Sequence, residues 1–142
     1  MRGRHGRTAT LAVAAFLAAS GVAAVASEPG RDEARFLSHV KEYFGDGPRP
    51  GWSRPVTDDV FVTEGDHACA WLAQQPVVTG RAPSQTSYEL FSRFITQVEP
   101  TPGWHYGTGR GLRGSVTYDA WTYLCPGIRQ SRTWNPPIED WD

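Results

Sequence analysis

Apolar residues recur at helical spacing in four segments of the chain. The strongest stripe predicts a helix over residues 86–98, opened by a capping-box pair of Thr86 and Glu89 and ended by Pro100. The apolar residues of this stripe are Tyr88, Phe91, Ile95 and Val98, with Leu90 and Phe94 beside them. We therefore expect Tyr88 to face the core.

Three further helices are predicted over residues 31–44, 58–74 and 115–124. Their inward-facing residues are Phe36, Leu37, Val40 and Phe44 in the first, Phe61, Gly65, Ala68, Cys69 and Leu72 in the second, and Val116, Ala120, Tyr123 and Leu124 in the last. Gly65 lowers helix propensity by about 1 kcal/mol relative to alanine, and a close approach of another helix would offset this loss. The pattern predicts an all-α fold, a small bundle of about four helices.

Two irregular segments are expected outside these helices. Residues 100–114 form a Gly-rich loop, and a loop of this length in a small domain is usually functional or mobile. Residues 127–142 form an irregular C-terminal tail, because Pro126 and Gly127 end the last predicted helix.

The first 26 residues have the pattern of a cleaved export signal. They carry three arginines and no acid, followed by an apolar stretch and the small-residue step Ala24-Val25-Ala26. Cleavage after Ala26 leaves a single domain, residues 27–142, without a stable membrane span; the alternative is that the apolar leader remains as a membrane anchor. We expect this domain to be secreted or held in the cell envelope.

The composition after the leader narrows the possible functions. The remaining chain has 11 basic and 15 acidic side chains, a charge of about −4, which argues against a nucleic-acid partner bound through bulk positive charge. Aliphatic residues are few, and Trp and Tyr supply much of the apolar area that a core needs. We expect a small, monomeric domain with a thin core.

Cys69 and Cys125 are the two cysteines of the chain. An even count in an exported chain points to a disulfide, and two free thiols are the alternative. The two cysteines lack the spacing of a zinc site. A bridge closing so long a loop would contribute about 4 kcal/mol, enough to decide whether a domain of this size folds.

Residues around the two cysteines resemble an exported helical domain of actinobacteria, domain of unknown function family 732. The residues that carry the resemblance are Phe36-Leu37, then Gly65, Ala68-Cys69 and Leu72, then Ala120 and Tyr123-Leu124-Cys125-Pro126. The resemblance implies a few helices after a signal peptide, with Cys69 and Cys125 as the structural pair. Two features depart from the family: the interval between the two cysteines is longer than usual, and the aromatic C-terminal tail is an addition. The family has no assigned chemistry.

Several catalytic patterns are weak here. Residues 109–114 match GxGxxG, but no buried strand precedes them as a dinucleotide site requires. Asp66 and His67 are neighbours that point about 100° apart on a helix, so they cannot form a simple dyad. No Gly-x-Ser-x-Gly sequence occurs, and no metal site or cofactor is predicted.

Aromatic and basic residues near the long loop are the stronger functional indication. Trp52, Trp104, Trp134 and Trp141 lie outside the predicted helices, whereas Trp71 and Trp121 lie within them. Exposed aromatic side chains dominate many interfaces, although here they can instead cover the thin core. We predict a ligand-binding surface formed by Trp104, Arg110 and Arg113. The function expected is non-enzymatic binding of an envelope protein or cell-wall ligand, and the alternative is a small envelope hydrolase built from histidines and carboxylates. A purely structural or stress-related secreted module is the third possibility.

Overall fold

The computed structural model describes residues 25, 28–44, 56–77, 83–104 and 110–133, and these form helices and their connections. In chain order the elements are α2 (Glu33–Phe44), α3 (Asp58–Ala73), α4 (Pro83–Gln97), α5 (Arg110–Asp119), the π-helical turn η1 (Ala120–Leu124) and α6 (Pro126–Thr133). The described part of the chain contains no strand. The predicted all-α fold is confirmed.

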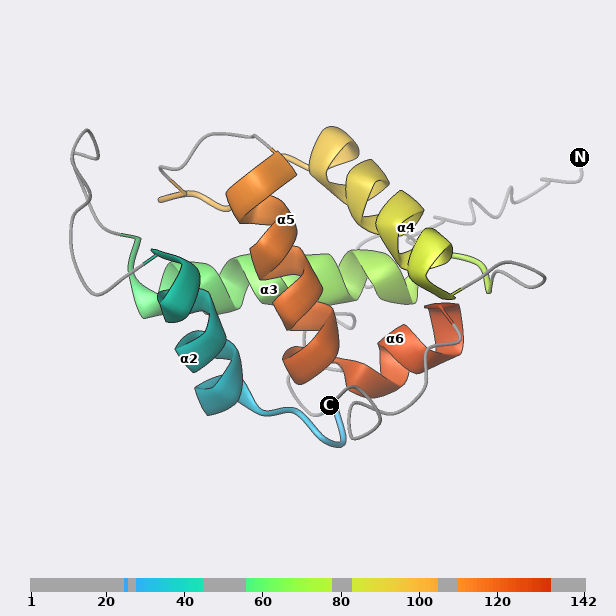
Figure 1. The fold of residues 1–142 in the computed structure, drawn as a ribbon, viewed down its shortest axis with the longest axis horizontal. Helices are drawn as coiled ribbons and strands as arrows, with labels where there is room; N and C mark the ends of the chain where they lie inside the picture. The colour runs from blue at the N-terminus through green and yellow to red at the C-terminus, as the bar shows by residue number, and fades with distance from the viewer. Residues whose placement is uncertain (1–24, 26–27, 45–55, 78–82, 105–109, 134–142) are drawn as a thin grey trace, which may run out of the picture.

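Helix α3 is the centre of the bundle. It runs along the long axis of the view in Figure 1, and α5 crosses it steeply. Helix α2 lies beside the N-terminal half of α3, and α4 and α6 lie toward its other end. Each of these helices contacts α3, so the apolar face of α3 is covered along its length.

The disulfide joins the central helix α3 to the end of the closing helix, the name used here for α5 and η1 together (residues 110–124). Cys69 of α3 and Cys125, directly after η1, are bonded across a sequence separation of 56 residues. Both residues are fully buried in the core. The predicted pairing is confirmed.

Gly65 allows α3 and the closing helix to approach each other. A methyl group at this position would lie 2.6 Å from Cδ1 of Leu124 and 3.1 Å from Cβ of Ala120. Real Cβ atoms do not show the shorter distance, so an alanine here would force the Leu124 side chain or the helix that carries it to shift. The close approach predicted at this glycine is present.

Aromatic rings fill the space that aliphatic residues leave. Trp121 is completely buried, and its indole Nε1 donates a hydrogen bond to the Ala68 carbonyl at 3.1 Å. The half-buried ring of Trp71 lies parallel to it, with 6.5 Å between ring centres. The other tryptophan that is described, Trp104, makes an edge-to-face contact with Phe61. Trp52, Trp134 and Trp141 lie outside the described residues.

Helix α4 differs from its prediction in its start and in its buried face. It begins at Pro83, so Thr86 is a buried residue inside the helix and not its N-cap. Leu90, Phe94 and Ile95 face the core, whereas Tyr88 is 55% exposed. The predicted inward position of Tyr88 is wrong because the core-facing stripe is rotated toward Leu90 and Phe94.

Two predicted irregular segments contain helix. Helix α5 begins at Arg110, within the expected loop, and α6 occupies the first part of the expected tail. Pro126 begins α6, because its fixed φ and its missing N–H suit the first position of a helix as well as a stop. The prediction of an irregular tail is therefore wrong for residues 127–133, and residues 134–142 lie outside the described part.

Val25 packs in the core although it lies before the predicted cleavage point after Ala26. Its side chain is 1% exposed, and its carbonyl accepts a hydrogen bond from the Glu28 N–H at 3.1 Å. Cleavage after Ala26 would remove this side chain from the core. The signal peptide and its cleavage site remain predictions.

Candidate functional site

The predicted binding surface of Trp104, Arg110 and Arg113 does not form as expected. Arg113 is completely buried, so its place on a solvent-facing surface was predicted wrongly. Trp104 is half-buried against Phe61. The side chain of Arg110 and the adjoining residues 105–109 lie outside the description. The part of this surface that is described therefore covers the core.

Arg113 instead binds the end of a neighbouring helix. Its Nη1 donates to the carbonyl oxygens of Ile95 at 3.1 Å and Val98 at 2.7 Å, which are orphan acceptors at the C-terminus of α4. Its guanidinium also lies 4.8 Å from the ring centre of Phe94. A positive charge at this end of the helix is favourable because the helix dipole is negative there.

Glu64 of α3 is the counter-ion of Arg113. The Nε of Arg113 donates to Oε1 of Glu64 at 2.5 Å, and both side chains are 0% exposed. The second carboxylate oxygen, Oε2, accepts the backbone N–H of Thr101 at 2.8 Å and its hydroxyl at 2.6 Å. This buried pair thus ties α3, α5, the end of α4 and the following turn together.

The hydrogen bonds of Thr101 also fix the ring of His67. The hydroxyl of Thr101 has a single proton, which goes to Glu64, so it accepts from Nδ1 of His67 at 3.1 Å. We therefore assign the hydrogen to Nδ1 of His67. Its neighbour Asp66 pairs instead with Arg31 at 2.7 Å, consistent with the expectation that Asp66 and His67 do not form a dyad.

A second group of ionisable side chains lies where α2 meets the end of α5. Asp119 is 4% exposed, and its Oδ2 has no hydrogen-bond partner among the described residues. Burial raises the pKa of Asp119 to about 6; the positive charge of His39 opposes this rise, Glu42 adds to it, and Arg129 opposes it. Nε2 of His39 lies 3.0 Å from the hydroxyl oxygen of Tyr123.

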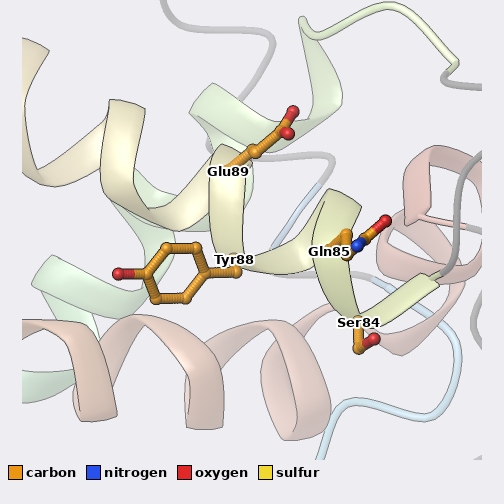
Figure 2. Close-up of a pocket in the computed structure, with 4 residues that line it drawn as sticks. All are labelled: Ser84, Gln85, Tyr88 and Glu89. Atoms are coloured by element: carbon orange, nitrogen blue, oxygen red, sulfur yellow. The ribbon is translucent and has the colours of Figure 1, made fainter.

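An open hollow lies on the outer side of α4. Its volume is about 460 Å³, and Ser84, Gln85, Tyr88 and Glu89 line it. Figure 2 shows the four side chains spreading from the first two turns of the helix. All four residues are exposed, so the hollow is open to solvent and combines one aromatic ring with a hydroxyl, an amide and a carboxylate.

The position of the Tyr88 ring is set by its packing. Tyr88 and Phe91 make an edge-to-face contact with 4.8 Å between ring centres. Phe91 in turn lies over Gly114 of α5, where a methyl group would come 3.4 Å from Cε2 of Phe91. The missing side chain of Gly114 therefore lets α5 support Phe91, and Phe91 supports the exposed ring.

Within the described residues, no three His, Cys, Asp or Glu side chains come together as a metal-ligand set. None of the described helices is long and apolar enough to cross a membrane.

Fold and site define the chain as a disulfide-bonded, all-helical protein with a solvent-open hollow around an aromatic ring. Comparison with protein-family models, with curated proteins and with solved structures finds no match to this chain. The resemblance to family 732 therefore stays a prediction.

The buried ion pair of Glu64 and Arg113 was not predicted, although the sequence contains a signal for it. Glu64 lies three residues after Phe61 and four before Ala68, inside the apolar stripe of α3. Arg113 lies three residues before Val116 on the inner face of α5. A charged residue on a buried stripe requires an opposite charge, so the two positions together indicate an internal ion pair.

Proposed function

We propose that this chain is an exported, non-enzymatic protein that binds a component of the cell envelope through the hollow on α4. The observation that carries the proposal is the ring of Tyr88 at the hollow, which is 55% exposed and packs edge-to-face against Phe91. A large aromatic side chain left in water at a concave surface is typical of a contact site.

Two further observations support the proposed location. The N-terminal residues have the pattern of an export signal. The Cys69–Cys125 disulfide is compatible with an oxidising compartment outside the cytoplasm. A relationship with the actinobacterial family 732 would agree with both features.

The test is a binding isotherm with isolated cell envelopes. Increasing amounts of envelope material are sedimented with the full chain produced in an exporting host, and the protein left in solution is measured. We expect saturable depletion that Tyr88→Ala weakens and that Tyr118→Ala leaves unchanged, because Tyr118 is an exposed tyrosine outside the hollow. Absence of saturable depletion would contradict the proposal.

A small envelope hydrolase is the second candidate. It is favoured by the raised pKa of Asp119, about 6, and by the electrostatic effect of His39 on this carboxyl group. His39 is in turn hydrogen-bonded to Tyr123. Hydrolysis of a fluorogenic acetyl ester by the purified chain, compared with His39→Gln, tests it. Equal rates for both proteins at pH values around 6 would remove this candidate.

A further inference from the structure

We propose that the hollow on α4 binds a sugar chain. This proposal rests on the envelope-binding function above and names the chemical class of the ligand. It is carried by the ring of Tyr88 together with the polar groups of Ser84, Gln85 and Glu89, which line the same hollow.

The Tyr88 ring offers a stacking surface of the kind that sugars use. One face of a pyranose ring presents C–H groups, which pack against an aromatic ring and leave the hydroxyl groups free at the edge. Tyr88 is 55% exposed, so much of its ring is open to a ligand, and its edge-to-face contact with Phe91 supports it on the side of α5. Phe91 is itself backed by Gly114 of α5.

The polar groups are spaced for the hydroxyl groups of such a ligand. Ser84 and Tyr88 are four residues apart, as are Gln85 and Glu89, so each pair lies on one side of the helix about 6 Å apart along its axis. Hydroxyl and amide groups both donate and accept hydrogen bonds, and a carboxylate accepts them. Sugar hydroxyls need donors and acceptors close together, which this arrangement supplies.

The size and polarity of the hollow favour a sugar over a peptide. Its volume of about 460 Å³ lies within the range of small-molecule sites, about 300–1,000 Å³. Peptides are recognised through apolar anchor pockets, an exposed sheet edge, or a groove lined by apolar or several aromatic side chains. Among the described lining residues Tyr88 provides the one aromatic surface, and the described ranges hold no strand that could accept an added one.

The experiment follows backbone amide signals of the ¹⁵N-labelled full chain, produced in an exporting host, during titration. The probes are a β-1,4-linked N-acetylglucosamine tetramer, a β-1,4-linked glucose tetramer and a proline-rich peptide. We expect saturable shifts at residues 84–89 with at least one of the sugars. Tyr88→Ala should weaken binding about tenfold, whereas Tyr88→Phe and the matched control Tyr118→Ala should retain it.

Three results would overturn the assignment of a sugar. The first is no saturable shift at residues 84–89 with either oligosaccharide, and the second is a shift that Tyr88→Ala leaves unchanged. The third is a response at these residues to the peptide alone. In each case saturable depletion by envelopes, lost in Tyr88→Ala, would leave the proposed binding function standing, so the two proposals fail separately.

Discussion

The buried carboxyl group of Asp119 makes the stability of the fold depend on pH. The side chain is 4% exposed, and burial raises its pKa from 3.8 to about 6. Among the surrounding charges His39 and Arg129 favour the ionised form and Glu42 opposes it, but burial outweighs them. The fold therefore favours the protonated acid.

The sign of the effect follows from proton binding. Between pH 3.8 and about 6 the folded chain holds a proton on Asp119 that the unfolded chain has released. The free energy of unfolding consequently falls as the pH rises through this window and is constant, for this group, on either side of it. A pKa rise of this size corresponds to a loss of at most about 3 kcal/mol above pH 6.

The variant Asp119→Asn tests this reasoning because its side chain stays neutral at every pH. Urea unfolding, followed by tryptophan fluorescence at several pH values from about 4 to 7, gives the unfolding free energy of both proteins. The difference, variant minus wild type, should grow by up to about 3 kcal/mol from the lowest to the highest pH. The amide also forms different hydrogen bonds from the carboxyl group, and this shifts the difference in unfolding free energy equally at every pH. The test therefore rests on how the difference changes with pH, and not on its absolute size.

Asp59→Asn serves as the matched control for the loss of one negative charge, since Asp59 is an exposed aspartate in the first turn of α3. A difference for Asp119→Asn that stays constant with pH would refute the reasoning. A difference that shrinks as the pH rises would show that ionised Asp119 stabilises the fold through His39 and Arg129.

Two further predictions concern the packing of the core. Arg113→Met leaves Glu64 charged and unpaired in the interior, so we expect the free energy of unfolding to fall by about 3–5 kcal/mol; adding Glu64→Met should recover part of this loss in the same urea assay. Gly65→Ala should lower the melting temperature in spite of its better helix propensity, because its methyl group would lie 2.6 Å from Leu124 and overpacking costs about 1–3 kcal/mol. An unchanged or higher melting temperature would show that the helices separate here without strain.

The inward-facing residues of α3 and of the closing helix were predictable because the pattern of small and large residues in each helix marks its buried face. Small residues such as Gly65 and Ala120 indicate a close approach, and the adjoining large residues show which face is inward. The cysteines then fix how the two helices pair. Their predicted bond left little freedom in this part of the fold.

The face of α4 could not be predicted in the same way. Tyr88 and Phe91 fit a helical stripe as well as Leu90 and Phe94 do, so periodicity alone does not decide between overlapping faces. The decision depends on α5, where Gly114 makes room for Phe91. That glycine lies in a GxGxxG sequence that local rules assign to a loop.

The position of the hollow on α4 therefore depends on contacts that are distant in sequence. The C-terminal end of this helix is held by the bonds from Arg113 to Ile95 and Val98, and its middle is held by the packing of Phe91 on α5. Each of these contacts involves α5, which also pairs with α3 through Glu64. Since Arg113 contacts the opposite end of α4 from Ser84 and Tyr88, it acts on the hollow by holding the helix that carries it. Arg113 was predicted to touch the ligand itself. In the structure it instead holds α4, the helix that carries the proposed binding surface.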